Sequence, residues 1–510
     1  MSNESRLKKS ARNLSATAIE QVSYTLISFI CRTVFIYTLG SEYLGYSGLF
    51  GDVLSLLSLG ELGIGTAITY FMYKPMALHD NIKISALLNY YKNIYRKIGI
   101  AMTGAGLLLV PFLDFFVSGI VVTDELVTIY VLYLLNTTIS YFFSYRNSIL
   151  VTDQKSYISS FIFTCVNLLQ NTLQMIFLLV TKNFIVYLII QICGTYLNNY
   201  IMAYYVGKHY PFIVNDNKSK IDNNLKYKIK RNIKAIFLSR VSSVIVTSTD
   251  NILISKFVST IVLGVYSNYV LFVGVGRTLM TKIFQALTGS VGNMIAKSSL
   301  EHIYEVYKKV WFINFWLIAV ISGLFFILIN QFIQLWAGEE YLLSTSIVLL
   351  IAVNMYFRFI RNTFLLLQDT MGLFKEMQNK SIAEAVINLS ASLFFVMYFK
   401  MGLEGILLGT FISNITTNFW YEPWVIYKKI HAPYREYITT FIKYLVAAVS
   451  SIVIAYLVTN FLILSTWLDF FLQLCISSLV INLFLALIFY KSNEFLYFKD
   501  IICRRLGMFK

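Results

Sequence analysis

Residues 310–330 read VWFINFWLIAVISGLFFILIN, a run of 21 residues without a charged side chain. A helix needs roughly 20 consecutive apolar residues to cross the hydrocarbon core of a bilayer. In lipid, all backbone N–H and C=O groups can form hydrogen bonds only in helices or closed barrels. The strands of a barrel would show alternating apolar residues in segments of about ten. The run therefore predicts a transmembrane helix.

Thirteen further runs of spanning length lie on either side of this one. They are residues 14–39, 44–73, 98–118, 124–150, 156–180, 184–207, 235–256, 262–290, 342–367, 381–399, 403–427, 437–459 and 464–490. The composition agrees, since 57% of the 510 residues are hydrophobic and only 13% are charged, whereas soluble domains are about a quarter charged. The sequence predicts an all-α integral membrane protein with about fourteen transmembrane helices and no sizeable soluble domain.

The basic residues predict how these helices are oriented. If the N-terminus is cytoplasmic, the inner segments hold 31 of the 42 Lys and Arg residues, and the outer loops hold only Lys182, Lys256 and Lys400. An excess of Lys and Arg in cytoplasmic loops is the usual pattern of bacterial membrane proteins. It predicts that both termini are cytoplasmic. Anionic lipid headgroups explain the net charge of +16, and no nucleic-acid partner is needed.

A basic segment and a short repeat divide the chain into parts. Residues 208–234 hold eight Lys and Arg residues near the middle of the chain. They are interpreted as a solvated linker, with a regulatory arm as the alternative. The string LGYSGLF at 44–50 is echoed by LGVYSNY at 263–269, as expected for parallel repeats. We expect an N-terminal lobe at 1–207, a linker at 208–234, a C-terminal lobe at 235–427, and two further helices with a basic tail at 428–510.

Eight basic residues fall inside predicted spans, where a charge is costly. They are Arg32, Arg146, Arg240, Arg277, Lys282, Arg358, Arg361 and Lys443. Arg146, Arg240 and Lys443 lie near cytoplasmic ends, where their side chains can reach the interface. We expect a polar cavity lined by Arg32, Arg277, Arg358 and Arg361. Arg358 and Arg361 share a helix face at i, i+3 spacing. Since guanidinium binds phosphate bidentately, these four residues predict an anionic cargo, and Arg146 and Arg240 are further candidates.

Acidic residues are fewer inside the spans. Asp250 lies at about the depth of Arg32, so it could pair with that arginine as part of a gate, bind a coupling cation, or form a static structural pair. Glu61 and Glu20 are further candidates for coupling or gating. The coupling ion would be H⁺ or Na⁺.

One predicted helix carries a polar stripe. Asn167, Gln170, Asn171 and Gln174 follow i, i+3, i+4, i+7 spacing on a single face. Such a stripe can hydrogen-bond sugar hydroxyls. The ordinary alternative is hydrogen bonding between packed helices.

The sequence shows no residue pattern that is typical of a catalytic or metal site. Five scattered cysteines show no CxxC spacing, and the four histidines fall in predicted cytoplasmic segments. There is no GxxxxGK[ST] phosphate loop. We therefore expect no catalytic residues, metal or cofactor.

Several strings resemble one family of transporters. They are YTLGSEYLGYSGLF at 37–50, LLSLGELGIG at 56–65, YKPMA at 73–77, TDNILIS at 249–255, GVYSNY at 264–269, GLEGI at 402–406 and EPW at 422–424. Together they resemble Wzx-like polysaccharide flippases of the Gram-positive type, within the MATE-like MOP superfamily. The matches are spread over most of the chain.

This resemblance implies a fold and a cargo. The fold would be two pseudo-symmetric six-helix lobes plus two C-terminal helices. The cargo would be an oligosaccharide on undecaprenyl pyrophosphate, moved from the inner to the outer leaflet of the bacterial cytoplasmic membrane during capsule, exopolysaccharide or O-antigen synthesis. Arginines in a central cavity are implied too, and a polymerase and glycosyltransferases of the same pathway would be partners.

Two other functions stay open at this stage. A cation-coupled exporter of small molecules could share the fold. A membrane polysaccharide polymerase handles similar substrates, but such enzymes usually have a sizeable outer loop, and the outer loops expected here are short.

Overall fold

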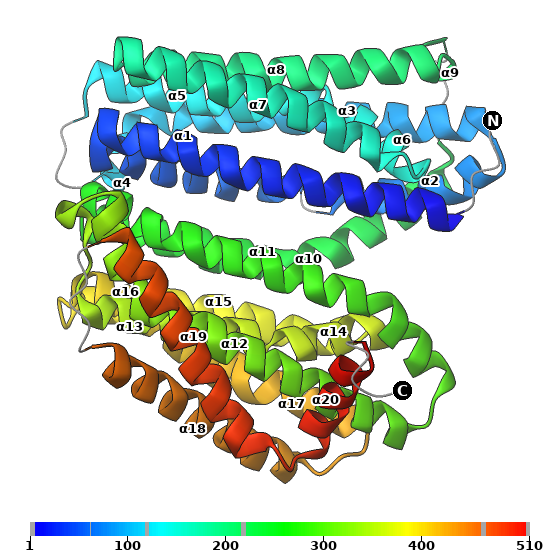
Figure 1. Cartoon of the computed structure of the whole chain (residues 1–510). Coiled ribbons are helices and arrows are strands. Elements are labelled where there is room, and N and C mark those ends of the chain that lie inside the picture. The colour runs from blue at the N-terminus through cyan, green and yellow to red at the C-terminus, as the bar shows by residue number, and fades with distance from the viewer. Residues whose placement is uncertain (1–5, 62, 118–121, 216–220, 461–465, 506–510) are drawn as a thin grey trace. The chain divides into compact units, whose positions relative to one another are not determined.

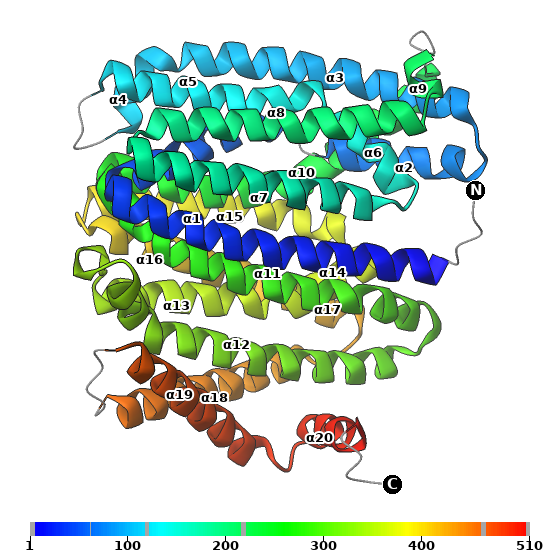
Figure 2. The same ribbon diagram turned by 45° about the horizontal axis from the view of Figure 1, so that its top comes forward.

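The computed structural model describes residues 6–61, 63–117, 122–215, 221–460 and 466–505. All regular structure in these residues is helical, and none of them lies in a strand. The chain forms two compact units, Met1–Gly264 and Val265–Lys510. Within the first unit, α1, α3, α5, α7 and α8 run alongside one another (Figures 1 and 2).

The helices of the first unit begin and end as follows. They are α1 (Arg6–Leu57), η1 (Ser58–Glu61), α2 (Ile64–Ala77), α3 (Asn81–Leu108), η2 (Val110–Phe112), α4 (Leu113–Phe116), α5 (Asp124–Ile139), η3 (Ser140–Phe142), η4 (Ser144–Arg146), α6 (Asn147–Thr152), α7 (Ser156–Thr181), α8 (Phe184–His209), α9 (Phe212–Asn215) and α10 (Asn223–Phe257). Helix α11 (Thr260–Lys297) starts in this unit and continues along the chain into the second. Helix α10, which the sequence assigns to the second lobe, packs against α1 and α2, and the lobe boundaries stay a prediction.

The second unit holds the remaining helices. They are α12 (Leu300–Trp336), η5 (Glu339–Tyr341), α13 (Thr345–Ile360), α14 (Asn362–Met371), α15 (Phe374–Met397), α16 (Gly402–Ser413), the π-helical segment η6 (Asn414–Asn418), α17 (Phe419–Lys429), α18 (Tyr434–Thr459), α19 (Trp467–Phe489) and α20 (Asn493–Arg505).

Each of the fourteen predicted apolar runs coincides with a helix or with an interrupted helix. In the described residues ten helices are long and apolar enough to cross a bilayer, or eleven when α3 is counted together with η2 and α4, which bend away by 43°. The chain is therefore a multi-pass membrane protein with an all-α fold. The count of fourteen spans stays a prediction, because several of the runs are broken.

The breaks have local causes. Helix α1 is kinked at Gly40, whose φ of 78° and ψ of −169° lie outside the helical region, so the first two predicted spans join there. The second span is interrupted again at η1, and α2 restarts after Gly63, whose φ of 86° is left-handed. Glycine adopts both conformations without the steric penalty of a side chain.

Aromatic side chains fill the core of the second unit. Trp311, Phe312 and Phe315 of α12 are buried, and the ring of Phe315 stacks on Tyr444 of α18 with centroids 4.2 Å apart. Phe489 of α19 packs edge-on against the same ring of Phe315. Burial of such rings stabilises packing beyond the area removed from water. The C-terminal pair α18 and α19 is thus anchored on α12.

The opposite face of the C-terminal pair is apolar and exposed. On α19, Leu468, Leu472, Leu479, Leu483 and Leu487 each expose at least half of their surface. An apolar face of this length is expected where a helix meets lipid acyl chains. Helix α20 follows as a shorter helix that turns away from α19 (Figure 2).

Candidate functional site

Arg32 of α1 marks a polar centre in the first unit. Its side chain is half-buried and lies within electrostatic range of Tyr133 of α5 and Tyr187 of α8. The hydroxyl of Tyr133 donates to the Oγ of Ser47, 2.7 Å away on α1. Three helices therefore bring a guanidinium and two phenols together. Such a group of donors suits an anion or a sugar hydroxyl.

The polar stripe of α7 lies beside this centre and takes part in helix packing. The amide nitrogen of Gln174, a buried residue, donates to the carbonyl oxygen of Tyr187 at 3.1 Å. Gln170 packs on Gly194 of α8, where an added methyl group would lie 2.1 Å from its Oε1. Asn171 donates back to the carbonyl oxygen of Asn167 at 2.8 Å. These contacts show that the stripe takes part in packing α7 against α8, the second alternative given by the sequence. Contact with sugar stays a prediction.

The predicted coupling acids all lie in the first unit. Glu20 is half-buried on α1, and Glu61 of η1 interacts with the hydroxyl of Tyr141. Asp250 is half-buried on α10. Its pairing with Arg32 and its role in coupling stay predictions.

Arg146 lies in η4, at the start of α6. Its Nη1 donates to the carbonyl oxygen of Ala203 on α8 at 3.2 Å, and its Nε donates to the hydroxyl of Tyr145 at the same distance. These bonds join the α6 region to α8. Arg240 lies on α10, and its side chain falls outside the described part of the structure.

Two of the predicted cations flank one helix crossing in the second unit. Gly276 of α11 contacts Phe359 of α13, since an added methyl group at the glycine would lie 3.3 Å from the phenyl ring. Arg277 and Arg358 are the chain neighbours of these two residues. Arg277 is exposed, and Arg358 is half-buried. The packing of α11 on α13 therefore brings the two predicted cations into one region.

Arg361 is the centre of a buried ionic network. It lies at the break between α13 and α14 and binds Glu422 of α17 bidentately, with Nε–Oε2 at 3.1 Å and Nη2–Oε1 at 2.6 Å. Its Nη1 lies 3.3 Å from Oε1 of Glu384 on α15. Lys380 binds the same two carboxylates, at 2.8 Å to Glu422 and 3.3 Å to Glu384. The network of Arg361, Lys380, Glu384 and Glu422 is formally neutral.

Helix irregularities position this network. The π-helical turn η6 aims two asparagines at it: Asn418 donates to Glu384 at 2.7 Å and to Asn414 at 2.9 Å. Lys380 in turn donates to the amide oxygen of Asn418 at 2.7 Å. Single π turns inside α-helices often occur at functional sites. The resulting cluster ties α14, α15, η6 and α17 together.

Sequence reasoning missed three of the four members of this network. Lys380 had been placed in a cytoplasmic segment, Glu384 had not been singled out, and Glu422 had been noted only in the string EPW. The i, i+4 spacing of Lys380 and Glu384 at the start of an apolar run was the available signal. Nothing in the sequence connects that pair with Arg361 or Glu422.

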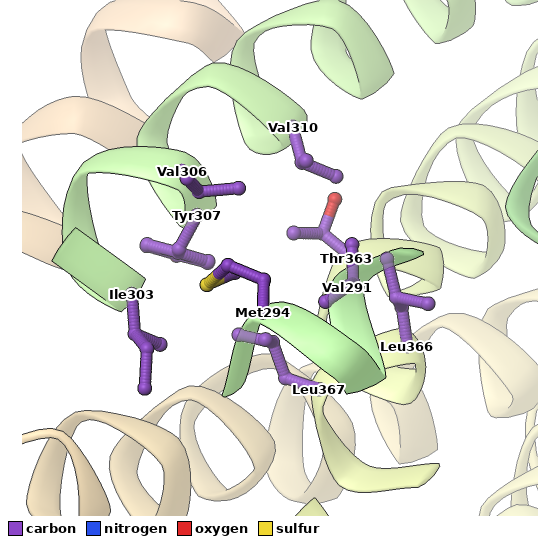
Figure 3. Close-up of a pocket in the computed structure, with 9 residues that line it drawn as sticks. All are labelled: Val291, Met294, Ile303, Val306, Tyr307, Val310, Thr363, Leu366 and Leu367. Carbon is purple, nitrogen blue, oxygen red and sulfur yellow. The ribbon is translucent and has the colours of Figure 1, made fainter. Parts of the chain in front are cut away.

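The second unit also contains two neighbouring cavities. One of about 10 Å³ lies among α11, α12 and α14, and side chains of all three point towards it (Figure 3). All nine of its lining residues are uncharged, and Thr363 and Tyr307 are the two with hydroxyl groups. A more open cavity of about 330 Å³ shares Ile303 with it and includes Lys429. The ionic network borders neither cavity.

Several solved structures have a similar fold. An inward-facing multidrug resistance MATE family transporter of the MOP superfamily matches 82% of this chain and 96% of its own, with a TM-score of 0.64 and 15% identity. The lipid II flippase MurJ in an inward closed conformation matches 93% of this chain and 98% of its own, with a TM-score of 0.64 and 16% identity. A MATE transporter in complex with MaL6 matches 86% and 97%, with a TM-score of 0.55 and 16% identity.

Comparisons of the sequence itself give no such match. No protein-family model matches the chain, and neither does any curated protein. Identities of 15–16% support a statement about fold alone. The chain therefore has the membrane fold shared by MATE-family transporters and the lipid II flippase MurJ.

Proposed function

We propose that this protein is a flippase that moves a lipid-linked oligosaccharide from the inner to the outer leaflet by alternating access. The cargo is the repeat unit of a capsule, exopolysaccharide or O-antigen on undecaprenyl pyrophosphate. The protein acts in the cytoplasmic membrane of a bacterium, with both termini in the cytoplasm. Glycosyltransferases and a polymerase of the same pathway act before and after it.

The extent of the fold likeness carries this proposal. The match to MurJ leaves 7% of the 510 residues, about 36, outside it. Helices α18 and α19 have 26 and 23 residues, so the match must include part of this pair. The match to the first MATE transporter leaves about 92 residues (18% of the 510) outside, enough to omit both helices. A match that reaches into the C-terminal pair supports the flippase.

The embedded cations support an anionic cargo. Arg32 stands among phenols in the first unit, and Arg277 and Arg358 flank the crossing of α11 and α13 in the second. Pyrophosphate offers the oxygen pairs that guanidinium binds best. Arg361 is already paired with two carboxylates, so we assign first contact with the pyrophosphate to Arg32, Arg277 and Arg358, with Arg361, Arg146 and Arg240 in support. In the stripe of Asn167, Gln170, Asn171 and Gln174, the last two are buried, so we assign sugar contact to the half-buried Asn167 and Gln170.

A cation-coupled exporter of small molecules is the second candidate, because MATE transporters have the same fold with an equal TM-score. Deleting the gene and extracting lipid-linked oligosaccharides separates the candidates. The flippase predicts that complete repeat units accumulate on the inner leaflet and that surface polysaccharide is lost. An exporter predicts no accumulation, and a polymerase predicts unpolymerised units on the outer leaflet.

A further inference from the structure

Asp52 and Asn251 join α1 to α10 inside the first unit. The amide nitrogen of Asn251 donates to Oδ2 of Asp52 at 2.6 Å, a short distance for an N–H···O bond. Ser248, one turn earlier on α10, also bonds the Asp52 side chain through its hydroxyl. Two neutral donors of one helix thus converge on one carboxylate of another.

The charge of the Asp52 carboxylate is balanced differently from the charges of Glu422 and Asp153. Glu422 is paired with Arg361 and Lys380, and Asp153 is paired with Lys155 at 2.7 Å. Within the part of the chain that the structure describes, no basic side chain lies within ion-pair distance of Asp52. Its half-buried side chain lies on a helix within the membrane span 19–57. A charge held only by neutral donors in that place is costly.

Other titratable groups stand on α1 itself and on the elements that pack against it. They are Tyr133 on α5, which bonds Ser47; Asp250 on α10, beside Asn251; Glu61 on η1; Tyr91, Lys92, Tyr95, Arg96 and Lys97 on α3; Tyr157 and Cys165 on α7; and Arg32 on α1 itself. The described contacts of Asp52 itself are with Asn251 and Ser248.

We propose that Asp52 is a proton-binding site of this protein, at which a proton is taken up and released during the transport cycle. A hydronium ion gives its proton to a carboxylate oxygen and leaves as water, so one O–H bond breaks as another forms, and release reverses the step. In the neutral acid the new O–H becomes a donor. It needs an acceptor, which the Asn251 amide supplies when it turns its oxygen towards Asp52.

The same contacts favour a proton over a sodium ion. A sodium ion requires several oxygen ligands directed at it, whereas the described side-chain partners of Asp52 are two, Asn251 and Ser248. A proton needs no cavity and reverses the direction of a single hydrogen bond. Because that bond joins α1 to α10, protonation changes how these two helices hold each other. This inference rests on the proposed transport function for its purpose, but the site itself is testable without substrate.

Infrared difference spectroscopy of the full-length protein in liposomes tests the proposal. We expect the carbonyl-stretch band of a protonated carboxylic acid to appear as the pH is lowered. The band should be absent in Asp52→Asn, present but displaced in Asp52→Glu, and unchanged in Asp153→Asn, whose acid already has a lysine partner. Identical spectra for the wild type and Asp52→Asn would overturn the assignment. If Asp52→Asn does not fold, an undisplaced band in Asp52→Glu overturns it equally.

Repeating the titration with sodium chloride in place of choline chloride tests the choice of ion. An unchanged band supports the proton, and a band abolished by sodium would show a cation site instead and overturn the proposal. These outcomes are independent of the cargo. If the Asp52 band appears but gene deletion causes no accumulation of oligosaccharide, the proton site stands and the flippase proposal fails. If oligosaccharide accumulates but the band does not depend on Asp52, the flippase proposal stands and the proton site fails.

Discussion

Gly45 of α1 and Gly264 of α11 pack backbone against backbone. A methyl group added at Gly264 would lie 1.9 Å from the carbonyl oxygen of Ser41 and 3.0 Å from the nitrogen of Gly45. One added at Gly45 would lie 2.0 Å from the carbonyl oxygen of Thr260. Both glycines occupy the second position of the string that repeats between 44–50 and 263–269. The repeat therefore marks a close helix crossing, and the internal symmetry that it suggests stays a prediction.

Gly264→Ala should destabilise the protein, because the new methyl group meets backbone atoms that cannot rotate away. Small residues let membrane helices approach this closely. We expect a lower melting temperature and less folded protein in detergent. Gly51→Ala on α1 is the matched control: no heavy atom lies within 4 Å of its added methyl group, and alanine is the better helix former by roughly 0.5–1 kcal/mol. Equal melting temperatures for the two variants would contradict the crossing.

Glu422→Gln should be the most damaging single change in the ionic network. Glu422 is 1% exposed and is the short-distance partner of both Arg361 and Lys380. Its loss leaves two buried cations sharing Glu384, and breaking a buried pair costs about 3–5 kcal/mol. The double variant Lys380→Met with Glu422→Gln should recover part of this loss in thermal melting. A double variant no more stable than Glu422→Gln alone would refute the coupling.

Tyr437→Phe should weaken the second unit through a backbone carbonyl. Pro423 has no N–H, so it cannot bond the carbonyl oxygen of Phe419 one turn before it. The hydroxyl of Tyr437 donates to that oxygen instead, at 2.6 Å. Its removal leaves a part-buried acceptor without this bond, and an unsatisfied buried acceptor costs about 1–3 kcal/mol.

Thermal melting can compare this variant with Tyr434→Phe. Tyr434 also donates to a backbone carbonyl, that of Trp420 at 3.1 Å, but in an exposed place. We expect little change in the control. A loss of similar size in both variants would mean that the missing N–H of Pro423 does not make the Tyr437 hydrogen bond more important than that of Tyr434.

Arg277→Ala should impair transport and spare the fold. The side chain is exposed, so little packing is lost. A hydrogen bond to a charged group contributes about 1.5–3 kcal/mol, which predicts a transport rate lower by about tenfold or more. Lys282→Ala is the control, since Lys282 is an equally exposed cation farther along α11. Accumulation of the lipid-linked repeat unit, corrected for membrane abundance, is the measurement. Wild-type transport by Arg277→Ala would remove this residue from the cargo site.

The sequence predicts the helices well because a bilayer imposes one length and one backbone structure on every apolar run. In the described residues, each run found in the sequence coincides with a helix or an interrupted helix. Interruptions are harder to predict, since the π-helical turn at Asn414–Asn418 and the break at Arg361 depend on tertiary contacts. Helix α15 begins at Phe374, before the apolar run that starts at residue 381, and therefore includes Lys380.

Candidate site residues are predicted less completely than helices. Depth and charge single out Arg361, but not the carboxylates that neutralise it, because those lie 23 and 61 residues away along the chain. The stripe on α7 shows the same limit. Its spacing predicts one polar face, but not that the carbonyl oxygen of Tyr187 on α8 accepts a hydrogen bond from Gln174.

The location of the lipid-linked oligosaccharide after gene deletion tests the central claim most directly. The account predicts that complete repeat units accumulate on the inner leaflet, that surface polysaccharide disappears, and that the intact gene restores both. Repeat units that reach the outer leaflet without the protein would contradict it.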